Sequence, residues 1–240
     1  MLFYEYVSLK FLHQCLDDVN LTWDKRLKIC IDVAHGLDYL HNEMEDQKMI
    51  IHGDLLSETI ELDETWGAKI VGFEESRMFL SNQDDHFIGE LFNTDDPLKR
   101  KISHNYYLDP EYKSTGILKK ESDIFSFGVV MLEILCGALL SDVIDSDDSE
   151  ELEDYRIWGL ARIWDGDRTI QQKLSPILTK NKYGHNLLLR KRPTRKQRKG
   201  LNTFTNLMYK CLNKSRSERP HMKVIIEELQ KASSFFSAGL

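Results

Sequence analysis

The sequence of 240 residues predicts a mainly α-helical fold with a short β region. Apolar side chains in residues 22–41 recur at the spacing of one helix face, and Thr22 is a suitable N-cap. Residues 122–137, with Ser122 as the expected N-cap, have almost no polar face, which is typical of a helix buried on all sides. Two β-like runs, residues 48–52 and 68–73, separate these helices. A helical domain built around the second helix is therefore expected.

The other elements follow from local patterns. The apolar and aromatic residues 1–6 predict a strand, and the polar residues 81–105, which lack periodicity, predict a loop. Helical spacing from Phe204 to Cys211 predicts a third helix. Pro220 is expected in the first turn of a last helix, where a missing backbone N–H costs little.

Two segments concentrate charge. Residues 142–154 contain eight acids, and residues 190–199 contain seven bases around Pro193, which disfavours a helix. Such runs indicate solvated loops, and we expect residues 181–200 to be a loop insertion. The basic run is also compatible with a nuclear-import signal or with contact to anionic lipid or a phosphorylated partner.

Composition limits the classes of function. With 41% hydrophobic and 30% charged residues the chain is typical of a globular protein, and its net charge of −7 argues against nucleic acid as a partner. No apolar run reaches the length of a membrane span and no signal peptide is recognisable, so we expect a cytosolic or nuclear chain. Scattered histidines and cysteines predict no metal site. The cysteines are expected to be reduced core thiols, namely Cys15, Cys30, Cys136 and Cys211.

Seven segments, taken in order, resemble the C-terminal lobe of a protein kinase, in particular that of plant receptor-like serine/threonine kinases. These segments are "YEYV", "GLDYLH", "IIHGDLLSETIELD", "AKIVGFEES", "YLDPEY", "SDIFSFGVVMLEILCG" and "RSERP". The resemblance implies one kinase-like domain over residues 1–240, made of the hinge and the large helical lobe with short β-hairpins, without the N-terminal lobe. It implies that Glu5 and Tyr6 are vestigial nucleotide-binding positions of the hinge, and that Glu61 lies at the floor of the adenine site. It favours a cytoplasmic location as well, with peripheral contact to the plasma membrane through a partner as a further option.

The resemblance also assigns structural positions. His52 and Phe73 match two apolar-spine positions, and Asp123 is expected to cap the backbone of the catalytic loop from the buried helix. Glu111 and Arg219 are expected to form a buried ion pair across 108 residues of chain. Removing one partner of such a pair costs roughly 3–5 kcal/mol.

Protein kinases need ATP, magnesium and several charged or amide side chains for phosphoryl transfer. Asp54 matches the catalytic-loop aspartate and is a vestigial base position. Five other catalytic positions are altered relative to the family: Gly53 for arginine, Leu56 for lysine, Thr59 for asparagine, Gly72 for the metal-binding aspartate, and Glu74 for glycine. Because both magnesium ligands are replaced, neither ATP nor magnesium is expected to act as a cofactor here.

The sequence therefore predicts a catalytically inactive pseudokinase fragment that acts as a scaffold or regulator of a signalling partner, such as an active receptor-like kinase. Two alternatives remain open. One is a serine/threonine kinase represented by a truncated chain, against which Gly72 and Thr59 argue. The other is a decaying gene copy without function, against which soluble monomeric expression would count.

Overall fold

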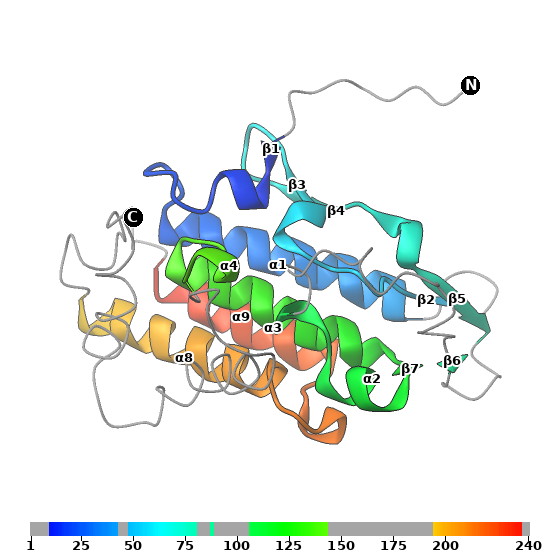
Figure 1. Ribbon diagram of the computed structural model, residues 1–240. Helices are drawn as coiled ribbons and strands as arrows, with labels where there is room; N and C mark the ends of the chain where they lie inside the picture. The colour runs from blue at the N-terminus through cyan, green and yellow to red at the C-terminus, as the bar shows by residue number, and fades with distance from the viewer. Residues whose placement is uncertain (1–9, 43–47, 81–86, 89–105, 144–193, 237–240) are drawn as a thin grey trace.

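The computed structural model describes residues 10–42, 48–80, 87–88, 106–143 and 194–236 (Figure 1). Long helices dominate these residues and short strands accompany them. The helices are α1 (Trp23–His41), α2 (Pro110–Thr115), α3 (Lys120–Cys136), α4 (Leu140–Val143), α8 (Arg195–Cys211) and α9 (Met222–Ser234). The strands are β1 (Lys10–Phe11), β2 (Lys48–Ile51), β3 (Ile60–Leu62), β4 (Ala68–Ile70), β5 (Arg77–Leu80), β6 (Phe87–Ile88) and β7 (Ile117–Leu118). The predicted mainly helical character is thus confirmed.

Helix α1 agrees with its predicted bounds. Thr22 is the N-cap residue, and its carbonyl accepts from the backbone N of Arg26 at 2.9 Å, although its side chain makes no capping bond. The buried face of α1 includes Leu27, Cys30 and Leu37, as its apolar spacing predicts. This face packs against α9 and β4.

Helix α3 lies at the centre of the molecule between α1 and α8 (Figure 1). Every residue from Ser122 to Cys136 is buried, which confirms the predicted central helix. Its start is corrected, because α3 begins at Lys120 and Ser122 lies within the first turn. There the Ser122 hydroxyl accepts from the backbone N of Lys119 at 3.3 Å. The helix ends before Gly137, whose φ of 69° is readily adopted by glycine.

The strands form three small antiparallel sheets. Strands β1, β3 and β4 form one sheet in the order β1-β3-β4, β2 pairs with β5, and β6 pairs with β7. Figure 1 shows this first sheet at the top of the view, above α1, which β4 contacts. The segment from β2 to β3, residues 52–59, is the candidate catalytic loop. It lies between two sheets and above α3.

The C-terminal helices begin at other residues than predicted. Helix α8 begins at Arg195, so the second half of the basic run is helical and not a loop. Thr194 and Gln197 form a capping box that fixes this start. Helix α9 begins at Met222 after the N-cap His221, which leaves Pro220 outside its first turn. Helices α8 and α9 pack against each other, and α8 also packs against α3.

Several predictions fall on residues that the structure does not describe. These are the strand at residues 1–6 with Glu5 and Tyr6, most of the acidic run, and the basic run before Thr194. Within residues 81–105, β6 is a strand where a loop was expected.

The four cysteines are buried free thiols, as predicted. None of the described helices is long and apolar enough to cross a membrane.

Candidate functional site

Asp123 supports the candidate catalytic loop from below, as predicted. Its side chain is fully buried in the first turn of α3. One oxygen, Oδ2, accepts from the backbone N of His52 at 2.8 Å, and Oδ1 accepts from the backbone N of Gly53 at 2.9 Å. His41, at the end of α1, places Nε2 2.7 Å from Oδ2. The sequence analysis did not identify His41, which only its position in "YLH" could have indicated.

His52 links the loop to the segment that follows β4. Its Nδ1 accepts from the backbone N of Asp54 at 3.3 Å, so Nε2 is the protonated nitrogen that donates to the Val71 carbonyl at 2.9 Å. Both ring nitrogens therefore have partners. Its ring contacts that of Phe73, with centroids 4.9 Å apart. His52 is a packed core residue, and Phe73 is 44% exposed on its other side.

The hydroxyl of Thr59 forms its hydrogen bonds within the candidate catalytic loop. Its Oγ1 accepts from the backbone N of Leu56 at 2.9 Å. The same hydroxyl lies 3.1 Å from the carbonyl of Leu56 and 3.3 Å from the carbonyl of Asp54, both of which are acceptors. A side chain bonded in this way stabilises the turn that contains Asp54. It presents only a methyl group toward Gly72.

Gly72 lies against that methyl group. Its φ is 81°, in the left-handed region, and a Cβ added there would lie 2.7 Å from Cγ2 of Thr59. No side chain at position 72 fits this backbone beside Thr59 without a shift. The carboxylate of Glu74 also approaches, with Oε2 3.7 Å from the same point. The two positions that the resemblance assigns to magnesium ligands are thus filled by one methyl group and one glycine.

The other altered positions are also part of the packing. Gly53 has a φ of 79°, and a Cβ there would lie 3.0 Å from the carbonyl oxygen of Glu75. Leu56 is 3% exposed and belongs to the main hydrophobic core. Glu61 lies in β3 opposite Lys69 of β4 and is half-buried. None of these residues brings a positive charge to Asp54.

The predicted ion pair of Glu111 with Arg219 is wrong, because Arg219 pairs with Asp109. Arg219 Nη2 lies 2.7 Å from Asp109 Oδ1, and the guanidinium of Arg216 contacts Oδ2 of the same carboxylate. Asp109 and Glu111 lie on either side of Pro110. Asp109 is the buried one of the two, at the N-cap position of α2. Glu111 accepts from the backbone N of Arg216 at 2.8 Å and remains 41% exposed.

The charge of Asp109 is stabilised by this arrangement. Burial opposes ionisation, but the guanidinium groups of Arg219 and Arg216 and the Ser122 hydroxyl hold the pKa of Asp109 below its usual range. The hydroxyl of Ser122 donates to Oδ2 at 2.8 Å. This cluster joins α2, α3 and the segment before α9. It is a structural element of the lobe.

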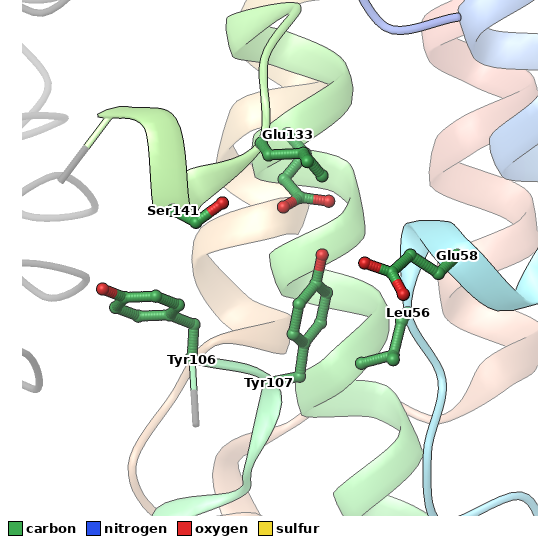
Figure 2. Close-up of a pocket in the computed structure, with 7 residues that line it drawn as sticks. Leu56, Glu58, Tyr106, Tyr107, Glu133 and Ser141 are labelled. Carbon is green, nitrogen blue, oxygen red and sulfur yellow. The ribbon is translucent and has the colours of Figure 1, made fainter. Parts of the chain in front are cut away.

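A second buried carboxylate, Glu133, lies on α3 next to a cavity of about 20 Å³. Glu133 accepts from the hydroxyl of Ser57, from that of Tyr107 and, at 3.0 Å, from the backbone N of Leu140. Burial raises its pKa to about 7. The cavity is lined by Leu56, Glu58, Tyr106, Tyr107, Glu133, Leu139 and Ser141. Figure 2 shows the Tyr107 hydroxyl pointing toward the Glu133 carboxylate.

The sequence analysis missed Glu133, although an acid within the otherwise apolar run of α3 was a signal. The fit of magnesium to the candidate site is poor. In the described residues no group of three or more histidines, cysteines or acids lies close enough to hold a metal ion. Asp54 is the one carboxylate at a matching catalytic position, and its expected amide and carboxylate partners are Thr59 and Gly72.

Comparison with known proteins places the chain among kinases. The family model described as protein tyrosine and serine/threonine kinase matches residues 1–229. The chain is similar to three proteins of Arabidopsis thaliana. It is 27% identical to the probable serine/threonine-protein kinase PBL28 over 95% of this chain and 55% of the relative. It is 32% identical to the receptor-like serine/threonine-protein kinase NCRK over 74% of this chain and 30% of the relative.

The third relative is a probable receptor-like serine/threonine-protein kinase, 31% identical over 96% of this chain and 46% of the relative. The chain therefore spans about half or less of the length of these curated relatives. The matched residues 1–229 include all seven segments on which the resemblance rests.

Proposed function

Because the chain belongs to the protein tyrosine and serine/threonine kinase family, we propose that it is a pseudokinase domain that acts as a scaffold or regulator of a signalling partner. In this proposal the helical lobe keeps the architecture of a kinase and transfers no phosphate. Relatives that are receptor-like serine/threonine kinases support an active kinase of that class as the partner. The proposed location is cytoplasmic, with the plasma membrane reached through this partner.

The contact between Thr59 and Gly72 is the observation that supports this proposal most. Phosphoryl transfer depends on positioning and on neutralising charge with magnesium. Gly72 has no side chain, and the Thr59 hydroxyl is bonded within its own loop. A Cβ added at position 72 would lie 2.7 Å from the Thr59 methyl group, so a side chain there needs a shift. The absence of a ligand side chain at both expected magnesium positions supports the proposal that neither ATP nor magnesium acts as a cofactor here.

Asp54 alone is insufficient for catalysis. Its backbone is fixed by His52 and Thr59, so the carboxylate position is kept by the fold. A base without preorganised charges around the phosphate lacks the largest source of transition-state stabilisation. The positions where the family has arginine and lysine are Gly53 and Leu56, and the second of these is buried. We assign Asp54 a structural role in the loop.

Thermal unfolding with and without magnesium and ATP tests the proposal, because a ligand that binds only the folded state raises the unfolding temperature. We expect one cooperative transition that nucleotide does not shift, and no phosphate transfer to a generic serine/threonine substrate. An upward shift confirmed by calorimetric titration would overturn the proposal. The absence of any cooperative transition would instead favour the decaying gene copy.

The double variant Thr59→Asn with Gly72→Asp provides the matched comparison. It restores both magnesium ligands and removes the methyl group that excludes a side chain at position 72. If this variant gains magnesium binding and the wild type has none, the two positions account for the loss. If both bind equally, the assignment of the metal positions is wrong.

A further inference from the structure

The outer side of α8 has an unusual charge. This helix contains five basic residues and no acidic residue, although the chain has a net charge of −7. Six of its exposed residues share one side of the helix by their spacing of three, four and seven positions, while Lys196 and Tyr209 are exposed beside them. We call this side the basic strip, and it consists of Arg195, Arg198, Lys199, Asn202, Asn206 and Lys210.

The orientation of the strip is fixed by packing. The opposite side of α8 is buried against α3 and α9 through residues such as Phe204, Met208 and Cys211. The capping box of Thr194 and Gln197 sets the first turn, with backbone-to-side-chain bonds of 3.2 and 2.9 Å. Figure 1 shows α8 at the edge of the helical lobe, beyond α9 from α1. The basic side chains therefore face solvent from a rigid element.

The fold gains little from these charges. Cations in the first turn of a helix oppose the helix dipole, which favours acids there. Among the residues that the structure describes, no carboxylate forms a salt bridge with Arg195, Arg198 or Lys199. Exposed cations that have no carboxylate partner among the described residues, of which Arg195 and Arg198 lie in the first turn, are available to bind an anionic group from outside.

We propose that the basic strip binds an acidic segment of a partner polypeptide, an inference that builds on the proposed role as a scaffold. From Arg195 to Lys210 the strip is about 22 Å long, which matches roughly six or seven residues of extended chain. The net charge of −7 disfavours a membrane or nucleic acid as the ligand. The negative charge of the whole molecule repels such an extended polyanion, even where the strip attracts it. A narrow acidic peptide contacts only the strip, where the exposed Asn202 provides an amide group between the cations.

Titration of the full chain with a fluorescently labelled oligoglutamate peptide tests the proposal. The variant combines Arg195→Glu, Arg198→Glu and Lys199→Glu, and it keeps its fold because acids suit the first turn of a helix. The matched control combines Lys10→Glu, Lys69→Glu and Lys223→Glu, which are exposed residues on β1, β4 and α9. Both variants change the net charge equally.

We expect salt-dependent binding that the strip variant weakens about tenfold or more and the control weakens less than about twofold. No binding of the peptide, or equal loss in both variants, would overturn the proposal. Stronger binding to vesicles of phosphatidylserine and phosphatidylcholine than to the peptide would assign the strip to a membrane and also overturn it.

One more outcome concerns the chain itself. If the peptide binds only after the acids of residues 142–154 are changed to their amides, the strip is occupied by that segment and the proposal is wrong. The nucleotide titration on the same chain keeps the two proposals separate. Binding of ATP would remove the proposed pseudokinase role without changing the peptide result, and loss of peptide binding would leave the nucleotide result unchanged.

Discussion

Asp123 and the pair Thr59–Gly72 lie at two ends of the candidate catalytic loop and differ in their chemistry. Below the loop, the buried side chain of Asp123 accepts hydrogen bonds from the backbone N atoms of His52 and Gly53. At the other end, the positions expected to bind magnesium have become a methyl group packed on a glycine. The difference shows that much of the support of the loop comes from Asp123, which lies outside the loop and is not one of the altered catalytic positions. At position 59 an altered residue still supports the loop, through the hydroxyl of Thr59.

The substitution Asp123→Ala should have the largest effect, because it removes the acceptor of two buried backbone N–H groups and of His41. We expect a loss of about 4 kcal/mol in the free energy of unfolding, measured by urea denaturation. The exposed residue Glu227 on α9 serves as control, since Glu227→Ala should change stability by less than about 0.5 kcal/mol. Equal effects of the two variants would show that the loop does not depend on Asp123.

The second effect concerns the arginine cluster. Asp109→Ala leaves two buried guanidinium groups without their carboxylate, and we expect a loss of about 3 kcal/mol in the same measurement. Glu111→Ala should cost less than about 1 kcal/mol, because its side chain is exposed to solvent. A larger loss of stability for Glu111→Ala than for Asp109→Ala would instead support the pairing of Glu111 with Arg219 that the sequence suggested.

The pH dependence of stability should reveal Glu133. Its pKa is about 7 in the folded chain, above the usual 4.5, so the folded state holds its proton more tightly than the unfolded state. Stability therefore falls as pH rises from about 4.5 to about 7, by up to about 3 kcal/mol. Urea denaturation across this window should show the fall, and Glu133→Gln should flatten it. An unchanged slope in the variant would rule out Glu133 as its source.

The smallest effect tests the contact of Thr59 with Gly72. Gly72→Ala should destabilise the chain by about 2 kcal/mol, because alanine is strained at this φ and meets the Thr59 methyl group. Thr59→Ser removes that methyl and keeps the hydroxyl. In a double-mutant cycle, Thr59→Ser should reduce the cost of Gly72→Ala by about 1 kcal/mol. Additive effects would mean that the two residues do not constrain each other.

The sequence predicted those elements whose signals are local. The apolar run of α3 permits no exposed face, and Thr22 precedes an apolar period, so both helices were found. Pro193 and the basic residues obscured the start of α8, although the spacing of Thr194 and Gln197 is that of a capping box. The local sequence pattern predicted a helix correctly where apolar periodicity and burial agreed, as in α1 and α3. At the start of α8 it was misleading, because the run of charges suggested a loop although a capping box begins a helix there.

Contacts between distant residues were harder to predict. Asp109 and Glu111 flank one proline, and the sequence does not indicate which carboxylate faces the arginines. The resemblance identified Thr59 and Gly72 separately, but their contact depends on the backbone conformation at position 72. Asp123 was predicted correctly because the resemblance assigned its role. The family organisation of the chain and the expected catalytic positions came from motifs, while the domain bounds and the expected absence of an N-terminal lobe stay predictions.

The left-handed backbone at Gly72 has an evolutionary consequence. An aspartate at position 72 would be strained at this φ and would lie against the Thr59 methyl group. The substitution would therefore lower the stability of the fold before a magnesium site is complete. Asparagine at position 59 alone would give up the hydroxyl that closes the loop around Asp54. Each of these single substitutions is therefore expected to cost folding stability by itself. A chain that acquires both expected magnesium ligands would have to change positions 59 and 72 together.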